Sequence, residues 1–410
     1  MATGQGLLHN RDFMLLWGGQ VVSTLGSMTS HVIYPLLILA LTDSPTAAGI
    51  AGALRFIPYV VFSLPVGALI DRWDRKRVMV VSDLGRAIAV GSIPVAMALD
   101  LLTLMHVYVV CFIEGSLFVF FNIAEVAALP RVVPRSELPQ ATAYNEAGFG
   151  VANIVGPPLG TVLYQAFGRA VPFVADAISY FVSLASLVSI KAKFQSEAIV
   201  VKRHLGAEIA EGLRWLWSKP LIRFMAFLTG GLNLVNAAMA LVMIVLAKDL
   251  GAGDAEIGVM FSIAGVGGIA GSLVGGRIAR RYTFGQVIVT TLWIASVSFL
   301  LFAAMPTFIW VGVLAGIFSF VGPIYNVVQF SYRVALIPDE LQGRVNSTFR
   351  LLAFGFMPIG ATLSGVVIEH FGVRAAVVAF AACLFFLSAL TTLNRHVREA
   401  QPIEHANASA

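Results

Sequence analysis

The sequence predicts an all-α integral membrane protein with twelve transmembrane helices in two pseudo-symmetric bundles of six. Three observations carry this prediction: the composition, a series of long apolar segments and an internal repeat. The 410 residues are 58% hydrophobic and 12% charged, and their mean hydropathy is +0.85. Soluble domains are about 45–50% apolar and about 25% charged. A chain with this much apolar surface therefore needs the bilayer as its solvent.

Apolar segments of roughly 20 residues or more, long enough to cross about 30 Å of hydrocarbon, recur along almost the whole chain. They must be helices, because lipid offers no hydrogen bonds to the backbone and the segments are too long and too uniformly apolar for barrel strands. The expected spans are 13–41, 46–70, 78–100, 103–129, 139–167, 170–190, 221–249, 254–279, 284–304, 307–335, 342–371 and 374–394.

A shift of 204 residues aligns similar residues at corresponding loops and helix ends. The matches are Gly67 with Gly271, Leu69 with Leu273, Lys76 with Arg280, Arg77 with Arg281, Pro134 with Pro338, Gly156 with Gly360, and Phe167-Gly168 with Phe371-Gly372. The repeat predicts an N-terminal bundle over residues 1–190 and a C-terminal bundle with a short cytoplasmic tail over residues 221–410. Residues 191–220 are then a cytoplasmic linker with a short interfacial helix. Since six is even, both halves enter the membrane the same way round.

Basic residues are distributed unequally between the two sets of loops. About 21 of the 27 Lys and Arg residues lie in the terminal segments and in one alternate set of loops with their adjoining span ends. The opposite loops hold only Arg169, Lys248 and Arg374. The positive-inside rule therefore predicts that both termini are cytoplasmic. The opening MATGQGLLHNRDF has no features of a cleavable signal peptide, and the two cysteines, both in apolar runs, predict no disulfide.

A charged loop, GALIDRWDRKR at residues 67–77, joins the second and third spans. It resembles the signature loop of the major facilitator superfamily, which has a glycine, an aspartate four residues later and then a basic cluster. The matching residues are Gly67, Asp71, Arg72, Arg75 and Lys76, whereas Asp74 stands where the superfamily usually has glycine. The resemblance implies the major facilitator fold and a secondary transporter.

We expect this loop to be part of a gate rather than a substrate site. Gly67 is expected to allow close approach of a neighbouring helix, and Asp71 to interact with the positive end of the eleventh span. Asp83, Arg86 and Glu125 are expected to complete a charge network on the same side. Simple positive-inside anchoring is the alternative for the basic residues.

The fifth span contains ANIVGPPLGT at residues 152–161, which resembles the antiporter motif of the superfamily. Gly156, Pro157 and Gly160 match, while Ala152 and Thr161 replace further glycines. Proline bends the helix and small residues let a neighbouring helix pack closely. In the family this pattern accompanies exporters that work by antiport; an ordinary kinked, tightly packed helix is the alternative.

Weaker similarity extends over nearly the whole chain. The runs NRDFMLLWGGQ, GALRFIPYV, VPFVADAISYF and IPDELQGRVNSTFR resemble the branch that contains bacterial enterobactin exporters and macrolide efflux pumps. This resemblance implies an exporter of bulky organic molecules in the bacterial inner membrane.

Ionisable side chains inside spans are costly and usually face a cavity or pair with another charge. An exporter driven by the proton gradient needs a group that takes up a proton when it faces outward and releases it inward. A buried carboxyl group suits this task, and a neighbouring arginine can reset it. We expect proton coupling at Glu114 first, then at Glu146 and Asp176, with Arg55 as a partner. A fixed structural ion pair is the alternative for each.

In this superfamily the first, fourth, seventh and tenth helices form the central cavity. The resemblance therefore implies substrate contacts at Gln20, Ser27, His31, Phe118, Asn122, Asn233, Asn236, Tyr325, Asn326, Gln329 and Phe330. A mostly apolar pocket with scattered amides and aromatic rings suits an amphipathic organic molecule better than a sugar or a small anion. For His31, which titrates in a suitable range, a hydrogen-bonded lining role is the alternative.

The sequence has no GxxxxGK[ST], CxxC, HExxH or GxSxG pattern. We therefore expect no enzyme, no metal and no cofactor other than the proton as coupling ion. The expected partners are a small organic substrate and membrane lipid, without nucleic acid, and the chain is expected to be a monomer. The predicted function is export of drug-like or siderophore-like molecules by proton antiport with alternating access. A proton-coupled importer or facilitator of a small organic solute, and a non-transporting membrane sensor, are the alternatives.

Overall fold

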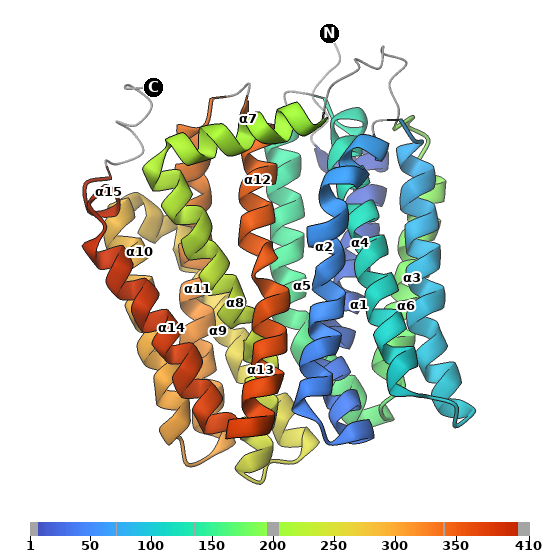
Figure 1. The fold of residues 1–410 in the computed structure, drawn as a ribbon. Helices are drawn as coiled ribbons and strands as arrows, with labels where there is room; N and C mark the ends of the chain where they lie inside the picture. Colours follow the sequence, from blue (N-terminus) through green and yellow to red (C-terminus); the bar gives the residue numbers. More distant parts are fainter. Residues whose placement is uncertain (1–6, 71, 135–136, 195–204, 339–340, 401–410) are drawn as a thin grey trace. The chain divides into compact units, whose positions relative to one another are not determined.

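The computed structural model describes residues 7–70, 72–134, 137–194, 205–338 and 341–400. Within these ranges all regular structure is helical and no strand occurs (Figure 1). Eleven helical segments in these ranges are long and apolar enough to cross a membrane, by length and composition. The predicted all-α membrane fold is confirmed.

The first half of the chain forms six long helices, each close to a predicted span. After a 3-10 turn, η1 (Leu7–His9), they are α1 (Arg11–Thr42), α2 (Pro45–Ile70), α3 (Arg75–Ala98), α4 (Leu104–Val132), α5 (Leu138–Phe167) and α6 (Val171–Ser189). Although α5 matches the predicted span 139–167, it is not among the eleven apolar segments. Its prolines and amides, Asn153 and Gln165 among them, lower its hydropathy.

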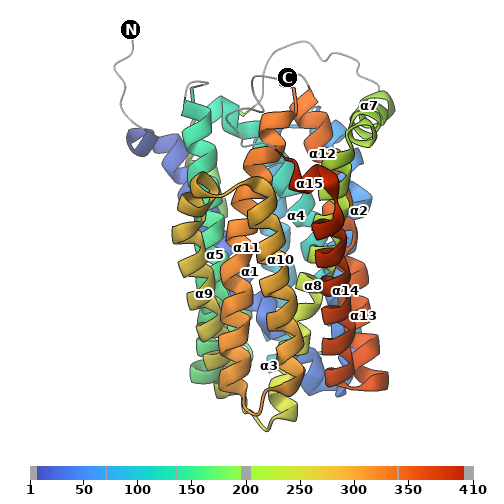
Figure 2. The same ribbon diagram turned by 90° about the vertical axis from the view of Figure 1, so that its left-hand side faces the viewer.

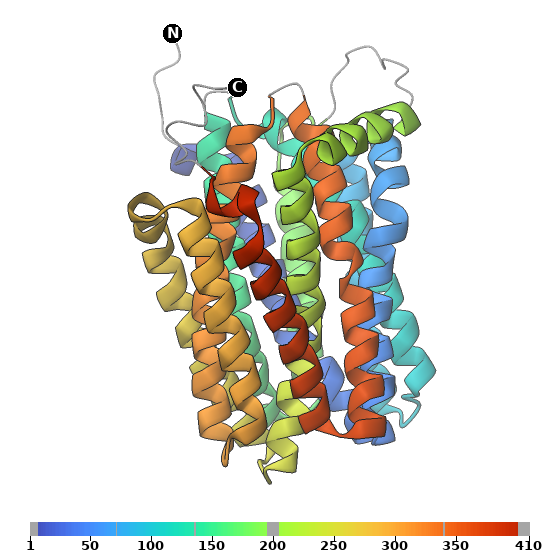
Figure 3. The ribbon, with the colours of Figure 1, turned by 60° about the vertical axis from the view of Figure 1, so that its left-hand side comes forward.

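The second half begins with the short helix predicted in the linker, α7 (Leu205–Ser218). The helices that follow are α8 (Pro220–Asp249), α9 (Asp254–Arg281), α10 (Phe284–Leu301) with the 3-10 turn η3 (Phe302–Ala304), α11 (Phe308–Leu336), α12 (Gln342–Gly355), α13 (Met357–Phe371), α14 (Val373–Leu393) and α15 (Arg395–Arg398). α7 packs on α8 and α12 and lies across their ends (Figure 3). An ion pair between Arg344 Nη1 and Glu211 Oε2 joins α12 to α7.

The predicted span 342–371 is present as one apolar segment, Arg344–Phe371. Within it the helix is interrupted at Phe356, where α12 and α13 meet. Pro358, in the first turn of α13, has no backbone N–H, and its ring conflicts with the carbonyl of the preceding turn. The interruption therefore places Pro358 in a first turn, where proline is best tolerated, although prolines such as Pro157 lie inside continuous helices elsewhere.

The contacts divide the chain into two compact units. Unit 1 contains Met1–Asp43 and Leu54–Lys202, and unit 2 contains Ser44–Ala53 and Arg203–Ala410. The start of α2 therefore belongs to unit 2, where the Ser44 hydroxyl donates a hydrogen bond of 2.6 Å to Glu369 on α13.

The same helix pairs pack in both units, as the repeat predicts. In unit 1, α1 packs on α5 and α6, while α3 packs on α4 and α6. In unit 2, α8 packs on α13 and α14, while α10 packs on α11 and α14. In addition α11 packs on α9, and α9, α10 and α11 run side by side in Figure 2. The internal repeat therefore extends from the amino-acid sequence to the way in which the helices pack.

Two glycines related by the repeat end equivalent helices. Gly168 follows α5 with φ of 90°, and Gly372 follows α13 with φ of 84°. A side chain is strained at such positive φ values, whereas glycine adopts them readily. This requirement explains why glycine occurs at both places.

Candidate functional site: a buried charge network in unit 1

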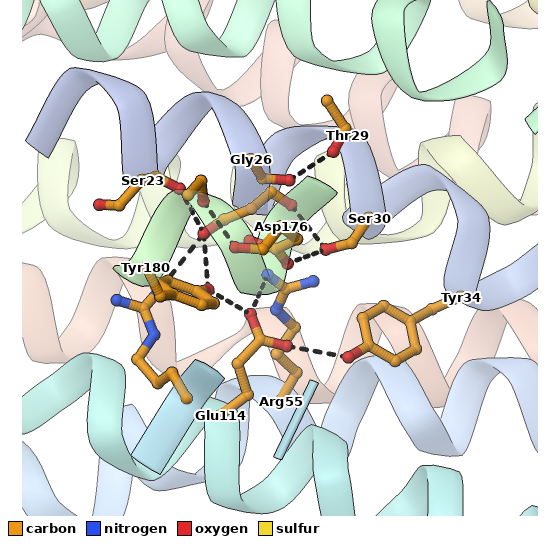
Figure 4. Close-up of polar contacts among 12 residues, drawn as sticks. Ser23, Gly26, Thr29, Ser30, Tyr34, Arg55, Glu114, Asp176 and Tyr180 are labelled. Carbon is orange, nitrogen blue, oxygen red and sulfur yellow. Dashed lines mark hydrogen bonds and ion pairs between the residues drawn. The ribbon is translucent and has the colours of Figure 1, made fainter. Parts of the chain in front are cut away.

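Four helices of unit 1 meet around the carboxylate of Glu114, whose side chain on α4 is 1% exposed (Figure 4). Arg55 Nη2, on α2, donates to Glu114 Oε1 at 2.7 Å. The Tyr34 hydroxyl, on α1, donates to Oε2 at 3.2 Å, and the Tyr180 hydroxyl, on α6, donates to Oε1 at 3.3 Å. Both carboxylate oxygens are therefore bound by donors from three other helices.

Tyr180 connects this ion pair to a second one. Its hydroxyl is 2.7 Å from Ser27 Oγ, which accepts a hydrogen bond of 3.3 Å from Arg86 Nη2. The Arg86 guanidinium lies over the Tyr180 ring at 4.1 Å, and Arg86 Nη1 is 3.6 Å from Asp83 Oδ1. The aromatic ring and its hydroxyl therefore bridge the two ion pairs.

Asp176 is the third buried carboxylate of the network and has no exposed surface. Its Oδ2 accepts a hydrogen bond of 2.6 Å from Ser30, and its Oδ1 has no hydrogen-bond partner in the described part of the chain. The network thus contains three carboxylates and two guanidinium groups: Asp83, Glu114, Asp176, Arg55 and Arg86. With all five ionised it has one excess negative charge.

Helical spacing brings these side chains together. Asp83 and Arg86 are three residues apart on α3, and Asp176 and Tyr180 are four apart on α6, so each pair shares a helix face. The backbones of α2 and α4 approach closely where Gly115 follows Glu114, since a Cβ at Gly115 would overlap the carbonyl of Arg55. This approach allows the ion pair to form between two helices in a tightly packed interior.

The predicted proton-coupling residues have different positions in the structure. Arg55, Glu114 and Asp176 belong to one network, whereas the side chain of Glu146 lies outside the described residues. Sequence reasoning missed Ser30, Tyr34 and Tyr180. Ser27, Ser30 and Tyr34 lie three and four residues apart, and this spacing could have indicated a polar face of α1.

The basic residues of the signature loop bind carbonyl groups within unit 1. Arg75 Nη1 donates to the carbonyl of Ala127 at 2.9 Å, and Lys76 Nζ donates to that of Ile190 at 2.7 Å, just beyond the end of α6. Arg72 is exposed, and Asp71 lies outside the described residues. Asp74 is the N-cap of α3, where its side chain accepts a hydrogen bond of 3.1 Å from Arg77 N. The departure from the superfamily pattern thus has a structural role.

Two observations bear on the expected gate. Among the described residues a Cβ at Gly67 would meet no atom within 4 Å, and the close helix approach expected there remains a prediction. Asp83 and Arg86 lie about 12–17 Å along the axis from the start of α3, and Arg86 contacts Ser27 and Tyr180, so they belong to the buried network and not to the loop. Glu125 accepts a hydrogen bond of 2.9 Å from Asn145 on α5.

The glycines of the antiporter motif lie where α5 meets α1. A Cβ at Gly156 would overlap Met28, and one at Gly160 would overlap the carbonyl of Thr29. Pro157 lies between them inside the continuous helix α5. The expected close packing of a neighbouring helix is observed, while the role in antiport remains a prediction.

The predicted substrate contacts fall into two groups. Some make contacts within their own unit: Ser27 with Tyr180, His31 edge-on to Phe56, Phe118 beneath Arg86, Asn233 with the carbonyl of Ala353, and Tyr325 with Thr229. Others are partly or largely exposed: Gln20, Asn122, Asn236, Asn326 and Phe330, whereas Gln329 is buried. A role in substrate binding remains a prediction for each.

The helical fold and the family match together identify a membrane transporter of the major facilitator superfamily. Residues 3–409 match the family described as transmembrane secretion effectors, and the chain belongs to this family. With its apolar helices, this makes it a multi-pass protein of the bacterial inner membrane.

Named relatives are efflux proteins. The chain is 26% identical to the multidrug efflux pump Tap of Mycolicibacterium fortuitum, over 91% of this chain and 93% of the relative. It is 27% identical to macrolide efflux protein A of Streptococcus pyogenes, over 88% of this chain and 90% of the relative. It is 25% identical to the enterobactin exporter EntS of Escherichia coli, over 82% of this chain and 80% of the relative.

Solved structures of transporters have the same fold. A variant of the nucleoside transporter NupG matches with a TM-score of 0.72 at 15% identity, over 93% of this chain and 98% of that one. A bacterial homologue of the human lysosomal transporter Spinster matches with a TM-score of 0.73 at 12% identity, over 98% and 99%.

Proposed function

We propose that this protein exports amphipathic organic molecules in exchange for protons, and that the buried network of unit 1 takes up and releases the proton. The charge balance of the network carries this proposal. Three carboxylates face two arginines, so one proton makes the network neutral. Burial strongly favours a neutral group of charges over one with an unpaired carboxylate. Contact with water on either side would allow the proton to leave or enter.

Proton uptake can be converted into helix movement through the Arg55–Glu114 pair. This pair joins α2 to α4, and a proton on Glu114 removes the charge that holds Arg55 at 2.7 Å. Tyr180 contacts both Glu114 and Ser27, which provides hydroxyl groups between the two ion pairs. His31 and Cys111 are further titratable side chains near Arg55 and Glu114. We propose that the two halves rock around a midplane site in response, as an alternating-access transporter does.

The proposed direction and substrate class rest on the relatives and on the distribution of charge. The relatives are described as multidrug, macrolide and enterobactin exporters, all of which handle organic molecules. About 21 of 27 basic residues lie on one side, and we propose that this side and both termini are cytoplasmic. The signature loop, with Asp71, is proposed to act as the gate on that side.

The proposal is tested with purified protein in proteoliposomes under an imposed pH gradient. A macrolide and enterobactin serve as probes, and a pH-sensitive dye in the lumen reports proton movement. We expect protons and the probe to cross the membrane in opposite directions. Glu114→Gln and Asp176→Asn should each lower gradient-driven transport at least tenfold while exchange of labelled for unlabelled probe continues, because exchange requires no net proton transfer.

Glu399→Gln is the matched control, because Glu399 is an exposed carboxylate whose ion pair among the described residues is with Arg395 on α15. It should retain gradient-driven transport. Unchanged transport in Glu114→Gln would remove this carboxylate from the mechanism. Protons and probe moving in the same direction would identify an importer instead.

A further inference from the structure

Among the described residues of unit 2, Arg333 is the arginine that is buried. Its surroundings differ from those of the arginines in unit 1. It lies at the end of the apolar part of α11 and is 5% exposed. No ion pair or hydrogen bond from its guanidinium occurs in the described part of the chain, and its Nε is buried without a partner. A buried cation without an anion is costly, so its retention requires an explanation.

Aromatic rings stabilise the cation but leave its donors available. The Arg333 guanidinium carbon is 3.9 Å from the ring centroid of Phe349 on α12 and 5.3 Å from that of Phe330 on α11. Contacts of this kind use the faces of the guanidinium and contribute about 0.5–2 kcal/mol each. The N–H groups lie in the guanidinium plane, where they suit the two oxygens of a carboxylate, sulfonate or phosphate.

Two further groups beside Arg333 favour an anion. Gln329, one helical turn earlier on the same face of α11, is 5% exposed, and its side-chain nitrogen has no hydrogen-bond partner in the described part of the chain. Arg350, on α12, is close enough to act electrostatically on Arg333. A buried cation and an unused amide donor therefore lie on one face of α11, with a second cation on α12 and no ion pair to an acidic side chain among the described residues.

Arg86 of unit 1 provides an internal comparison. It also lies among aromatic rings, at 4.1 Å from Tyr180 and 5.6 Å from Phe118, but the chain provides Asp83 and the Ser27 hydroxyl as its polar partners. Among the described residues, an anion is present beside one aromatic-bound arginine and absent beside the other. A bound molecule could supply the anion for Arg333.

We propose that Arg333 and Gln329 on α11, with Arg350 on α12, bind the anionic group of an amphipathic organic molecule. The inference rests on the proposed export function and names its substrate class more closely. Phe330, 46% exposed beside the guanidinium, offers apolar surface to the organic part of the ligand. A phospholipid headgroup has the same anionic chemistry, but a lipid-facing arginine would be exposed, and Arg333 is not.

Two fluorescent probes with the same ring skeleton test the site. They are 8-anilinonaphthalene-1-sulfonate, which is an anion, and N-phenyl-1-naphthylamine, which is neutral. Binding is measured with the full chain in nanodiscs of phosphatidylcholine, with empty nanodiscs as the blank. We expect Arg333→Gln to weaken binding of the sulfonate about 10- to 100-fold, as loss of a hydrogen bond to a charged group predicts. Binding of the neutral probe should stay unchanged, which also shows that the variant is folded.

Arg281→Gln is the matched control, since Arg281 is an exposed arginine that contacts the ring of Tyr282 at 5.9 Å. It should bind both probes as the unaltered chain does. Equal sulfonate affinity in the unaltered chain and in Arg333→Gln overturns the proposal, as does equal loss of both probes. Sulfonate affinity that falls as phosphatidylglycerol is added assigns the site to lipid headgroups and overturns the substrate assignment.

Binding of the two probes is independent of proton coupling. A preference for the sulfonate that depends on Arg333 can therefore hold even if Glu114→Gln leaves gradient-driven transport intact. Conversely, the two probes can bind equally well while gradient-driven transport still depends on Glu114. That result would support the proposed antiport and rule out the anion site.

Discussion

Arg55 and Arg86 of unit 1 each lie beside a carboxylate, whereas Arg333 of unit 2 packs against two phenyl rings without an anion from the described chain. The scaffolds around them are nevertheless alike, because the same helix pairs pack in both units. At the repeat offset, apolar residues replace the charged ones: Val259 corresponds to Arg55, Phe318 to Glu114 and Phe380 to Asp176.

This difference separates what the fold requires from what function requires. Unit 2 forms the same packing scheme with phenylalanines at two of the positions where unit 1 has buried carboxylates, so the scaffold does not need the charges. Buried ion pairs are often no more stable than well-packed apolar residues. The packing scheme therefore does not require the charges of unit 1, which agrees with the proposed role of the network in proton coupling.

The largest expected effect comes from breaking the central ion pair. Arg55→Met leaves Glu114 buried without a cation and should lower the free energy of unfolding by about 3–5 kcal/mol. Val259→Met, at the corresponding and exposed position of unit 2, should change it by less than about 0.5 kcal/mol. Denaturant unfolding in one detergent measures both.

The double variant Arg55→Met with Glu114→Gln separates the pair from its surroundings. It should recover more than half of the stability lost in Arg55→Met, since the unpaired charge is removed. If the double variant is as unstable as the single one, lost packing and not the unpaired carboxylate explains the effect.

Tyrosine hydroxyls provide the second comparison. Tyr180→Phe removes a hydrogen bond to the Glu114 carboxylate and should cost about 1.5–3 kcal/mol, whereas Tyr325→Phe removes a bond of 2.9 Å to the neutral Thr229 and should cost about 0.5–1.5 kcal/mol. Gradient-driven transport should slow only in Tyr180→Phe. Equal slowing in both variants would argue against a special role of the unit 1 network.

The third comparison uses the glycines of the two signature-loop copies. Gly271→Ala places a Cβ against the carbonyl of Phe320 and should destabilise the protein by about 1–3 kcal/mol. Gly67→Ala places it in open space and should stabilise the helix by about 0.5–1 kcal/mol. Thermal unfolding of both variants measures the difference. If Gly67→Ala is destabilised instead, a neighbouring helix must lie close to Gly67, as the sequence motif predicts.

The smallest expected effect concerns equivalent helix caps. Asp74→Ala removes the N-cap of α3, and Thr283→Ala removes that of α10, where Thr283 Oγ1 accepts a hydrogen bond of 3.4 Å from Gln286 N. Each should cost about 1 kcal/mol, while Asp74→Asn should cost little because asparagine caps equally well. A loss in Asp74→Asn as large as in Asp74→Ala would show that the charge of Asp74, and not its capping bond, matters.

Much of the helical plan could be predicted because it depends on local patterns. The spans were long apolar segments, and α3, α4, α6 and α14 end within a few residues of the predicted positions. The division of the predicted span 342–371 was missed, although Pro358 is a local signal that could have indicated it. The open space at Gly67 could not be predicted, because it depends on how far a neighbouring helix lies.

The sequence by itself determined that the chain needs a bilayer, that it repeats after 204 residues and that few ionisable residues lie within its spans. These properties follow from composition and periodicity, which act along the chain. Only the tertiary structure decided that Tyr34 and Tyr180 bind Glu114, that Arg86 joins their network and that Arg333 has no acidic partner among the described residues. Such contacts join helices far apart in sequence, and their formation depends on which faces meet when the helices pack.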